Sequence, residues 1–113
     1  MDVTLLYFDD CPNWHTADDR VRAALAMVGV EATILYQVVE TQRDAEHLGF
    51  NGSPTVLIDG VDPFADPGAV AGLACRVYRT QDGLAGAPSV EELIDAFHGA
   101  LSRDPSTGGT GEQ

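Results

Sequence analysis

The chain has 113 residues, of which 44% are hydrophobic, and its six basic residues against 18 acidic ones give a formal net charge of −12. This length predicts one domain with one core, and no apolar stretch approaches the roughly 20 residues that cross a bilayer. All basic residues are Arg. So few cations make nucleic acid and anionic membranes unexpected partners. Because the N-terminus shows no basic segment and no cleavage pattern, a cytoplasmic location is expected.

The first third of the chain predicts a strand, a helix and a second strand. Residues 3–8 form a nearly continuous apolar run, which is typical of a strand covered on both faces. Apolar residues then recur at helical spacing over 15–28, and Gly29 stands where a helix would end. The apolar, β-branched run 32–39 predicts the second strand.

The middle of the chain continues with a short helix and a third strand. Thr41 and Asp44 have the spacing of a capping box, so a short helix is expected to begin there and to end near Leu48. Residues 55–58 predict the third strand. The Asp-Gly pair that follows favours a tight hairpin turn, because both residues tolerate positive φ.

The chain after this turn has a less regular hydrophobic pattern. A short fourth strand is expected over 61–64. Glycines and prolines interrupt residues 65–88, and only 74–80, which contains Cys75, has a strand-like pattern. We therefore expect an insertion or a long ordered loop over 65–88.

The C-terminal region predicts a last helix and a tail. Ser89 and Glu92 form a second capping box ahead of a regular apolar stripe, so a helix is expected over 89–101. Residues 102–113 are rich in Gly, Ser, Thr and Pro and are expected to be disordered. Residues 1–101 then form a single α/β domain, with a mixed four-stranded sheet and helices on both of its faces.

A reactive thiol is predicted at the start of the first helix. Cys11 is followed by Pro12 and Trp14, and a helix N-terminus favours the thiolate form of a nearby cysteine. His15 one turn along would lower the thiol pKa if protonated, whereas Asp10 would raise it. We expect Cys11 to be an exposed nucleophile, with Trp14 as a wall of the site or as a packing residue.

The residues Ser53, Pro54 and Thr55 complete this motif. Cys11-Pro12 after the first strand and Ser53-Pro54-Thr55 before the third resemble the thioredoxin-like superfamily over residues 1–64 and 89–101. More narrowly, the chain is similar to small actinobacterial thioredoxin-like proteins with a Cys-Pro-x-Trp site, some of which are labelled alkylmercury lyases. The resemblance implies a cis Ser53-Pro54 bond opposite Cys11, with Pro12, Trp14 and these three residues contacting the substrate.

The function expected from this resemblance is thiol-disulfide exchange without a cofactor, on a thiol or disulfide substrate that is a protein or a small molecule. Trp14 replaces the second cysteine of a dithiol motif, so Cys75 or an external thiol would resolve the mixed disulfide. Alternatives are an organomercurial lyase that uses Cys11, Cys75 and Asp9 or Asp10, soft-metal binding by the two thiols, and a non-catalytic binding module. No structural zinc site is expected.

Overall fold

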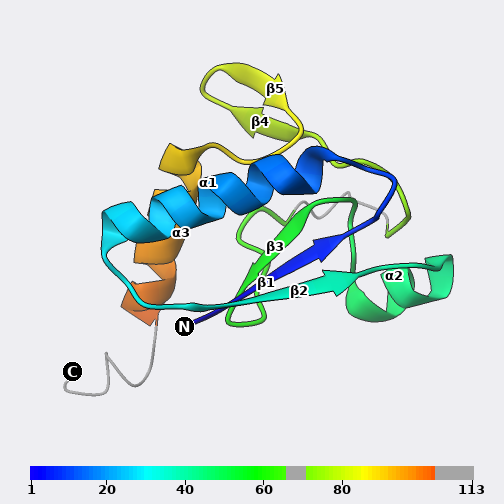
Figure 1. The fold of residues 1–113 in the computed structure, drawn as a ribbon, viewed down its shortest axis with the longest axis horizontal. Coiled ribbons are helices and arrows are strands. Elements are labelled where there is room, and N and C mark those ends of the chain that lie inside the picture. Colours follow the sequence, from blue (N-terminus) through cyan, green and yellow to red (C-terminus); the bar gives the residue numbers. More distant parts are fainter. Residues whose placement is uncertain (66–70, 104–113) are drawn as a thin grey trace.

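The computed structural model describes residues 1–65 and 71–103 of the chain, and these residues form an α/β fold with three helices (Figure 1). The elements run in the order β1 (Asp2–Tyr7), α1 (Asn13–Val28), β2 (Thr33–Val38), α2 (Gln42–Leu48), β3 (Thr55–Ile58), β4 (Tyr78–Thr80), β5 (Gly83–Ala85) and α3 (Val90–Arg103). Among the helices described, none has the length and apolar character needed to cross a membrane.

The main sheet is mixed and has β1 at its centre. β1 pairs in parallel with β2 on one side and antiparallel with β3 on the other, so that Leu5 is flanked by Tyr36 and Val56. The parallel pair is connected by α1, as a parallel crossover requires. The predicted mixed sheet is therefore present, and β4 and β5 form a separate hairpin, drawn above α1 in Figure 1.

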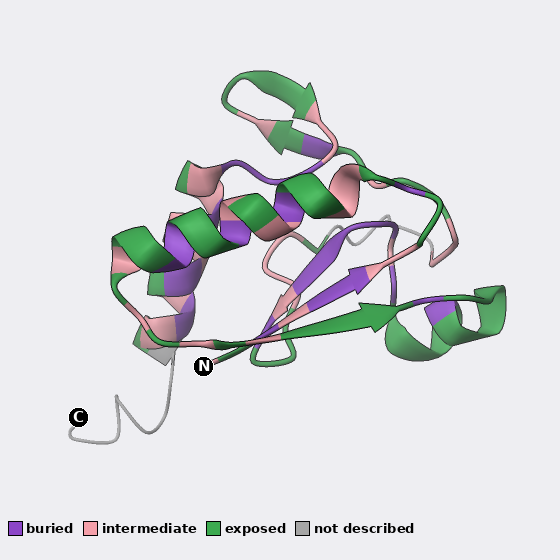
Figure 2. Cartoon of the chain, in the orientation of Figure 1, coloured by how far each residue is buried: buried purple, intermediate pink, exposed green. Residues whose placement is uncertain are grey.

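The larger core lies between the sheet and the helices α1 and α3. Alternate residues of β1 and β3 face these helices, and Figure 2 shows the buried positions along both elements. The buried residues of this core are Val3, Leu5, Ala17, Val21, Ala24, Leu25, Val56, Ile58, Ala87, Leu93, Phe97 and Ala100. Their removal from water is the main favourable term for this half of the fold.

A smaller core lies on the opposite face of β1. Because successive strand residues point to opposite sides, Leu6 faces away from the larger core and packs in a cluster with Val39, Ala45 and Phe50. Ala45 belongs to α2. One residue of α2 therefore packs on this face, whereas β2 is largely exposed, so the predicted covering of both faces by helices is only partial.

Both predicted N-caps form, and the one at α3 is a complete capping box. Ser89 and Glu92 cap the start of α3 reciprocally, with N–H to side-chain distances of 3.0 and 3.1 Å. Thr41 Oγ1 accepts from the N–H of Asp44 at 3.0 Å at the start of α2. Gly29 ends α1 at a φ of 77°, a conformation that glycine adopts without strain.

The predicted fourth strand at 61–64 does not form. The Asp-Gly turn at 59–60 is present, but Val61 makes only an isolated bridge to Ile58. Asp62 Oδ1 then accepts from the N–H of Phe64 at 2.9 Å and bends the chain, and Pro63 has no N–H to offer a ladder. The main sheet consequently has three strands where four were expected.

The region 65–88 contains more regular structure than the sequence predicted. The strand-like stretch 74–80 separates into a bridge at Cys75 and the strand β4, and β4 returns through β5, which was not predicted. At the C-terminus α3 continues to Arg103, two residues beyond the predicted end. The rest of the predicted disordered tail lies outside the described residues.

Candidate functional site

Cys11 lies in the turn that joins β1 to α1. Its N–H donates to the carbonyl oxygen of Phe8 at 2.9 Å, and Pro12 is the N-cap residue of the helix. No side chain caps this end of α1, and its first turn carries no acidic residue. The first N–H groups of a helix lack partners within the helix, and such an end favours the thiolate form of a reduced cysteine beside it.

Cys11 is not the exposed thiol that was expected. Only 1% of its surface is exposed. The segment 74–76 accounts for this burial. It pairs with Ser53, the residue that faces Cys11, and Cys75 forms a disulfide with Cys11. The predicted position is therefore correct and the predicted exposure is wrong.

Ser53 faces Cys11 from the start of β3. Ser53 Oγ accepts from the N–H of Phe8 at 3.0 Å, and Cys11 Sγ lies 3.6 Å from the carbonyl oxygen of Ser53. The Ser53-Pro54 peptide bond is cis, as the resemblance implied. The two halves of the predicted motif, 42 residues apart along the chain, are thus in direct contact.

Cys75 is brought to this contact by backbone pairing. The N–H of Ser53 donates to the carbonyl oxygen of Ala74 at 2.7 Å, and the N–H of Arg76 donates to the carbonyl oxygen of Ser53 at 2.8 Å. Cys75 therefore pairs with Ser53 as a parallel strand residue. It forms a disulfide with Cys11 at a Cα to Cα distance of 5.9 Å, within the usual range for such a bond.

Arg76 anchors the segment that carries Cys75. Its guanidinium donates to Asp62 Oδ2 at 2.8 Å, to Thr55 Oγ1 at 3.3 Å and to the carbonyl oxygen of Phe64. It also lies 4.6 Å from the ring centroid of Tyr78, close enough for a cation–π contact. Arg76 therefore forms a salt link with Asp62, and it holds the 74–76 segment to the body of the protein.

Tyr78 and Gly52 complete the attachment. The Tyr78 hydroxyl donates to the carbonyl oxygen of Pro54 at 2.5 Å, and burial of this side chain raises the pKa of its hydroxyl well above the usual range. Gly52 has a φ of +114°, and a Cβ at this position would lie 2.9 Å from the Cβ of Arg76 and 3.2 Å from the carbonyl oxygen of Ala74. Glycine at position 52 is thus what allows the segment to approach.

Trp14, three residues after Cys11, belongs to a stack of aromatic rings. The ring centroid of Trp14 lies 4.4 Å from that of Tyr7 and 3.8 Å from that of His15, and Tyr36 meets its edge at 6.5 Å. Trp14 is half-buried and packs against the larger core. His15 is exposed and its ring lies on Trp14.

Two cavities flank the disulfide region. One, of about 450 Å³, is lined by Asn51, Phe64, Ala65, Cys75, Arg76, Val77, Tyr78 and Arg79. The other, of about 320 Å³, is lined by Tyr7, Phe8, Asp9, Asp10, Val38, Val39 and Glu40. Asp9 and Asp10 are exposed and line a different cavity from Cys75.

The sequence located some of these residues and missed others. It placed Cys11, Ser53 and Pro54 together, and it left the distance from Cys11 to Cys75 open. Gly52 and Tyr78 were not identified. The signal for Gly52 was available, because a glycine directly before a Ser-Pro step is typical of a place where another backbone approaches closely.

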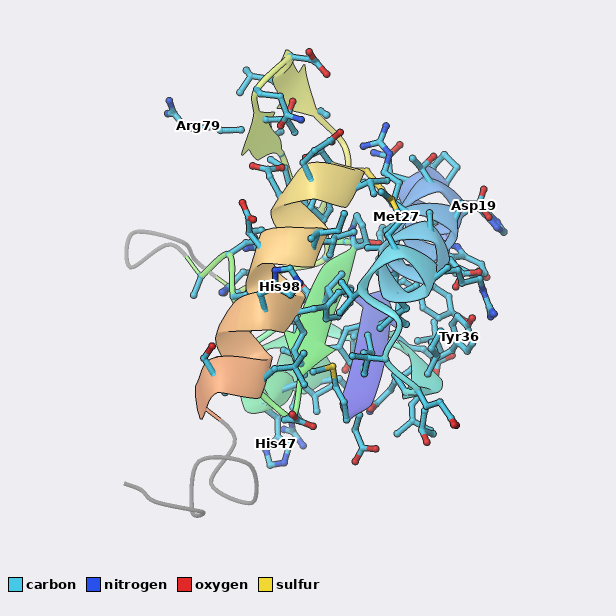
Figure 3. All side chains as sticks on the ribbon, turned by 90° about the vertical axis from the view of Figure 1, so that its left-hand side faces the viewer. Asp19, Met27, Tyr36, His47, Arg79 and His98 are labelled. Carbon is cyan, nitrogen blue, oxygen red and sulfur yellow. A yellow bond between two sulfur atoms is a disulfide. The ribbon has the colours of Figure 1, made fainter. Side chains whose placement is uncertain are left out.

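The two other histidines lie on helices. His47 and His98 are exposed on α2 and α3 (Figure 3). Within residues 1–65 and 71–103, no three or more His, Cys, Asp or Glu side chains cluster as a metal site. No protein family, no curated protein and no solved structure matches this chain.

Proposed function

We propose that this protein is a thioredoxin-like thiol-disulfide oxidoreductase whose redox couple is the pair Cys11 and Cys75. The observation that carries the proposal is the disulfide between them, held at a Cα distance of 5.9 Å by backbone bonds from Ser53 to both neighbours of Cys75. These bonds do not involve sulfur. They would keep the two thiols close after reduction, which favours rapid closure of the disulfide.

The proposed exchange runs in two balanced steps. A thiolate attacks one sulfur of the Cys11–Cys75 bond, forms a mixed disulfide and releases the other cysteine as a thiolate. A second thiolate then attacks the sulfur of the bound group, which leaves as an external disulfide. Two electrons pass from the external thiols to the protein, and the reverse sequence oxidises external thiols.

The α1 N-terminus supports this role for Cys11. Cys11 directly precedes the N-cap Pro12, where no side chain caps the helix. The positive end of the helix dipole favours the thiolate of a nearby reduced cysteine, and a stabilised thiolate is a good leaving group. The ring of His15 stacks on Trp14.

The thioredoxin-like assignment is supported by topology as well as by the site. β1, α1 and β2 form a parallel crossover unit, and β3 adds antiparallel to β1. Cys11 follows the last residue of β1 and Ser53 precedes the first residue of the antiparallel strand β3, so both lie at the same end of these strands. The fourth strand of the expected sheet is the part of the assignment without support in this chain.

A second candidate function is soft-metal binding by the reduced pair. Two thiolates 5.9 Å apart at Cα are close enough to share one linear two-coordinate ion, and soft cations such as Hg²⁺ or Cu⁺ prefer sulfur ligands. A proximal carboxylate, which a lyase activity would add, is not part of the cavity that Cys75 lines.

The experiment is a redox titration of the purified protein. It is equilibrated with defined ratios of reduced and oxidised dithiothreitol, quenched with an alkylating agent, and analysed by mass. We expect one two-electron transition in which both cysteines change state together. The Cys11→Ser and Cys75→Ser variants are matched controls and should show no such transition.

Two results would contradict the proposal. One is independent alkylation of the two cysteines at every redox ratio. The other is a reversible disulfide that exchanges no faster with external thiols than a disulfide in an unfolded peptide of residues 8–14 linked to residues 72–78. Stoichiometric binding of one Hg²⁺ by a protein without exchange activity would favour the second candidate.

A further inference from the structure

The two cysteines of the disulfide differ in their exposure to solvent. Cys11 is 1% exposed, whereas Cys75 is exposed and lines the cavity of about 450 Å³. An attacking thiolate must come into contact with the sulfur that it attacks, so access decides which bond partner is expelled. The cavity volume falls in the range of small-molecule sites.

The cavity that Cys75 lines is a place where positive charge gathers in a strongly acidic protein. Two of the six basic residues, Arg76 and Arg79, belong to its lining. Arg76 is compensated by Asp62. Arg79 is exposed, extends from β4 away from the body of the protein (Figure 3), and forms no ion pair with a carboxylate of the described residues. It therefore leaves a net positive charge at the rim of the cavity.

The cavity lined by the residues directly before Cys11 has the opposite charge. The residues directly before Cys11 are Asp9 and Asp10, and both line the neighbouring cavity together with Glu40. An anionic molecule is repelled from this side and attracted to the side of Arg79. The remaining lining of the Cys75 cavity is largely apolar, with Phe64 and Val77, and suits the carbon chain of a small thiol.

We infer that the disulfide is opened from the Cys75 side by a small thiol that carries a carboxylate, and that Arg79 selects this charge. This inference rests on the proposed function. The thiolate of the small molecule attacks Cys75 Sγ, the new bond is a mixed disulfide on Cys75, and Cys11 leaves as a thiolate at the head of α1. A second molecule attacks the sulfur of the first, which leaves as the small-molecule disulfide, and Cys75 is released as a thiolate.

The first test finds the sulfur that is attacked, and it uses the wild-type protein. The oxidised protein is mixed with glutathione, a tripeptide thiol with two carboxylates, and the reaction is stopped with acid at short times. Peptide mass analysis then locates the glutathione. We expect most of the mixed disulfide on Cys75 and a free thiol at Cys11. A majority on Cys11 would overturn the inference.

The second test measures charge selection with matched variants. The rate constant for opening the disulfide is measured at low salt with glutathione, with neutral 2-mercaptoethanol and with cationic cysteamine. Arg79→Ala should slow glutathione by about 2- to 5-fold, as expected of one exposed charge pair, and leave 2-mercaptoethanol unchanged. Arg79→Lys should restore most of the rate. Arg43→Ala makes the same charge change at an exposed residue of α2 and should have no effect.

The outcomes separate this inference from the proposed function. Equal slowing by Arg43→Ala and Arg79→Ala would mean that only the total charge matters, and would overturn a site at Arg79. Slowing of 2-mercaptoethanol by Arg79→Ala would also overturn it. In both cases the disulfide still opens and closes, so the redox couple stands. Failure of the disulfide to exchange with any of the three thiols would instead reject the proposed function.

Discussion

Ser53 and Cys75 pair as neighbouring strand residues, and both hydrogen-bonding groups of the Ser53 backbone are used by the residues on either side of Cys75. The same Ser53 carbonyl oxygen lies 3.6 Å from Cys11 Sγ. One residue thus contacts both members of the disulfide. The 74–76 segment is held by this pairing, by the Arg76 ion pair and by the disulfide, and each attachment can be removed separately.

Removal of the disulfide should destabilise the fold. The bond joins residues 64 positions apart, so its reduction restores much conformational freedom to the unfolded chain, and we expect the free energy of unfolding to fall by about 2–4 kcal/mol. Urea denaturation with and without reductant measures this. Cys75→Ser is the control, because its stability should not respond to reductant. Equal stability of the oxidised and reduced wild-type protein would contradict the prediction.

Substitution of Gly52 by Ala should loosen the 74–76 segment. The added Cβ would meet backbone of that segment and the Cβ of Arg76 at 2.9 Å, so the N–H groups of Ser53 and Arg76 should lose protection in hydrogen exchange. Gly60→Ala is a matched control, because Gly60 also has a positive φ, of +84°, but has no neighbour within 4 Å of the added Cβ. Equal loss of protection in both variants would show that backbone strain alone is responsible.

The elements that the sequence predicted well are those specified by local patterns. β3 has the predicted bounds of 55–58, and the caps at Ser89 and Gly29 form as expected, because each depends on residues within one turn. The contact of Cys11 with Ser53 was predictable only from the resemblance. It joins two segments that no local pattern relates.

The position of Cys75 could not be predicted because it depends on long-range contacts. The residues around it are interrupted by glycines and prolines, and the segment takes its place through backbone bonds to Ser53 and through the pairing of Arg76 with Asp62. From the sequence alone, an Arg is expected to be an exposed cation. Burial of its guanidinium, with 9% of the side chain exposed, follows only from the surrounding fold.

Replacement of Tyr78 by Phe should reduce the loss of folding stability at alkaline pH. Burial raises the pKa of the Tyr78 hydroxyl above its value in the unfolded chain, which is about 10. The folded state therefore holds this proton more tightly, and its contribution to stability is complete below about pH 10 and is lost as the pH rises above that value. Thermal unfolding from pH 7 to 11 should show a fall in wild type that is shallower in Tyr78→Phe. Parallel curves would contradict this.

Replacement of Asp62 by Asn should lower the free energy of unfolding far more than the same change at Asp18. Both carboxylates pair with an Arg, but the Arg76–Asp62 side chains are 9% and 13% exposed, whereas the Arg22–Asp18 side chains are 56% and 21% exposed. Loss of one member leaves the Arg76 charge buried without a partner, at a cost of about 3–5 kcal/mol. Chemical denaturation measures this, and Asp18→Asn should change little because water solvates Arg22. The Asn side-chain oxygen can still accept from the N–H of Phe64, so the bend at 62–64 should be retained. Faster opening of the disulfide in Asp62→Asn would then indicate that the 74–76 segment itself is released. Equal stability of the two variants would show that Arg76 does not anchor that segment through its charge.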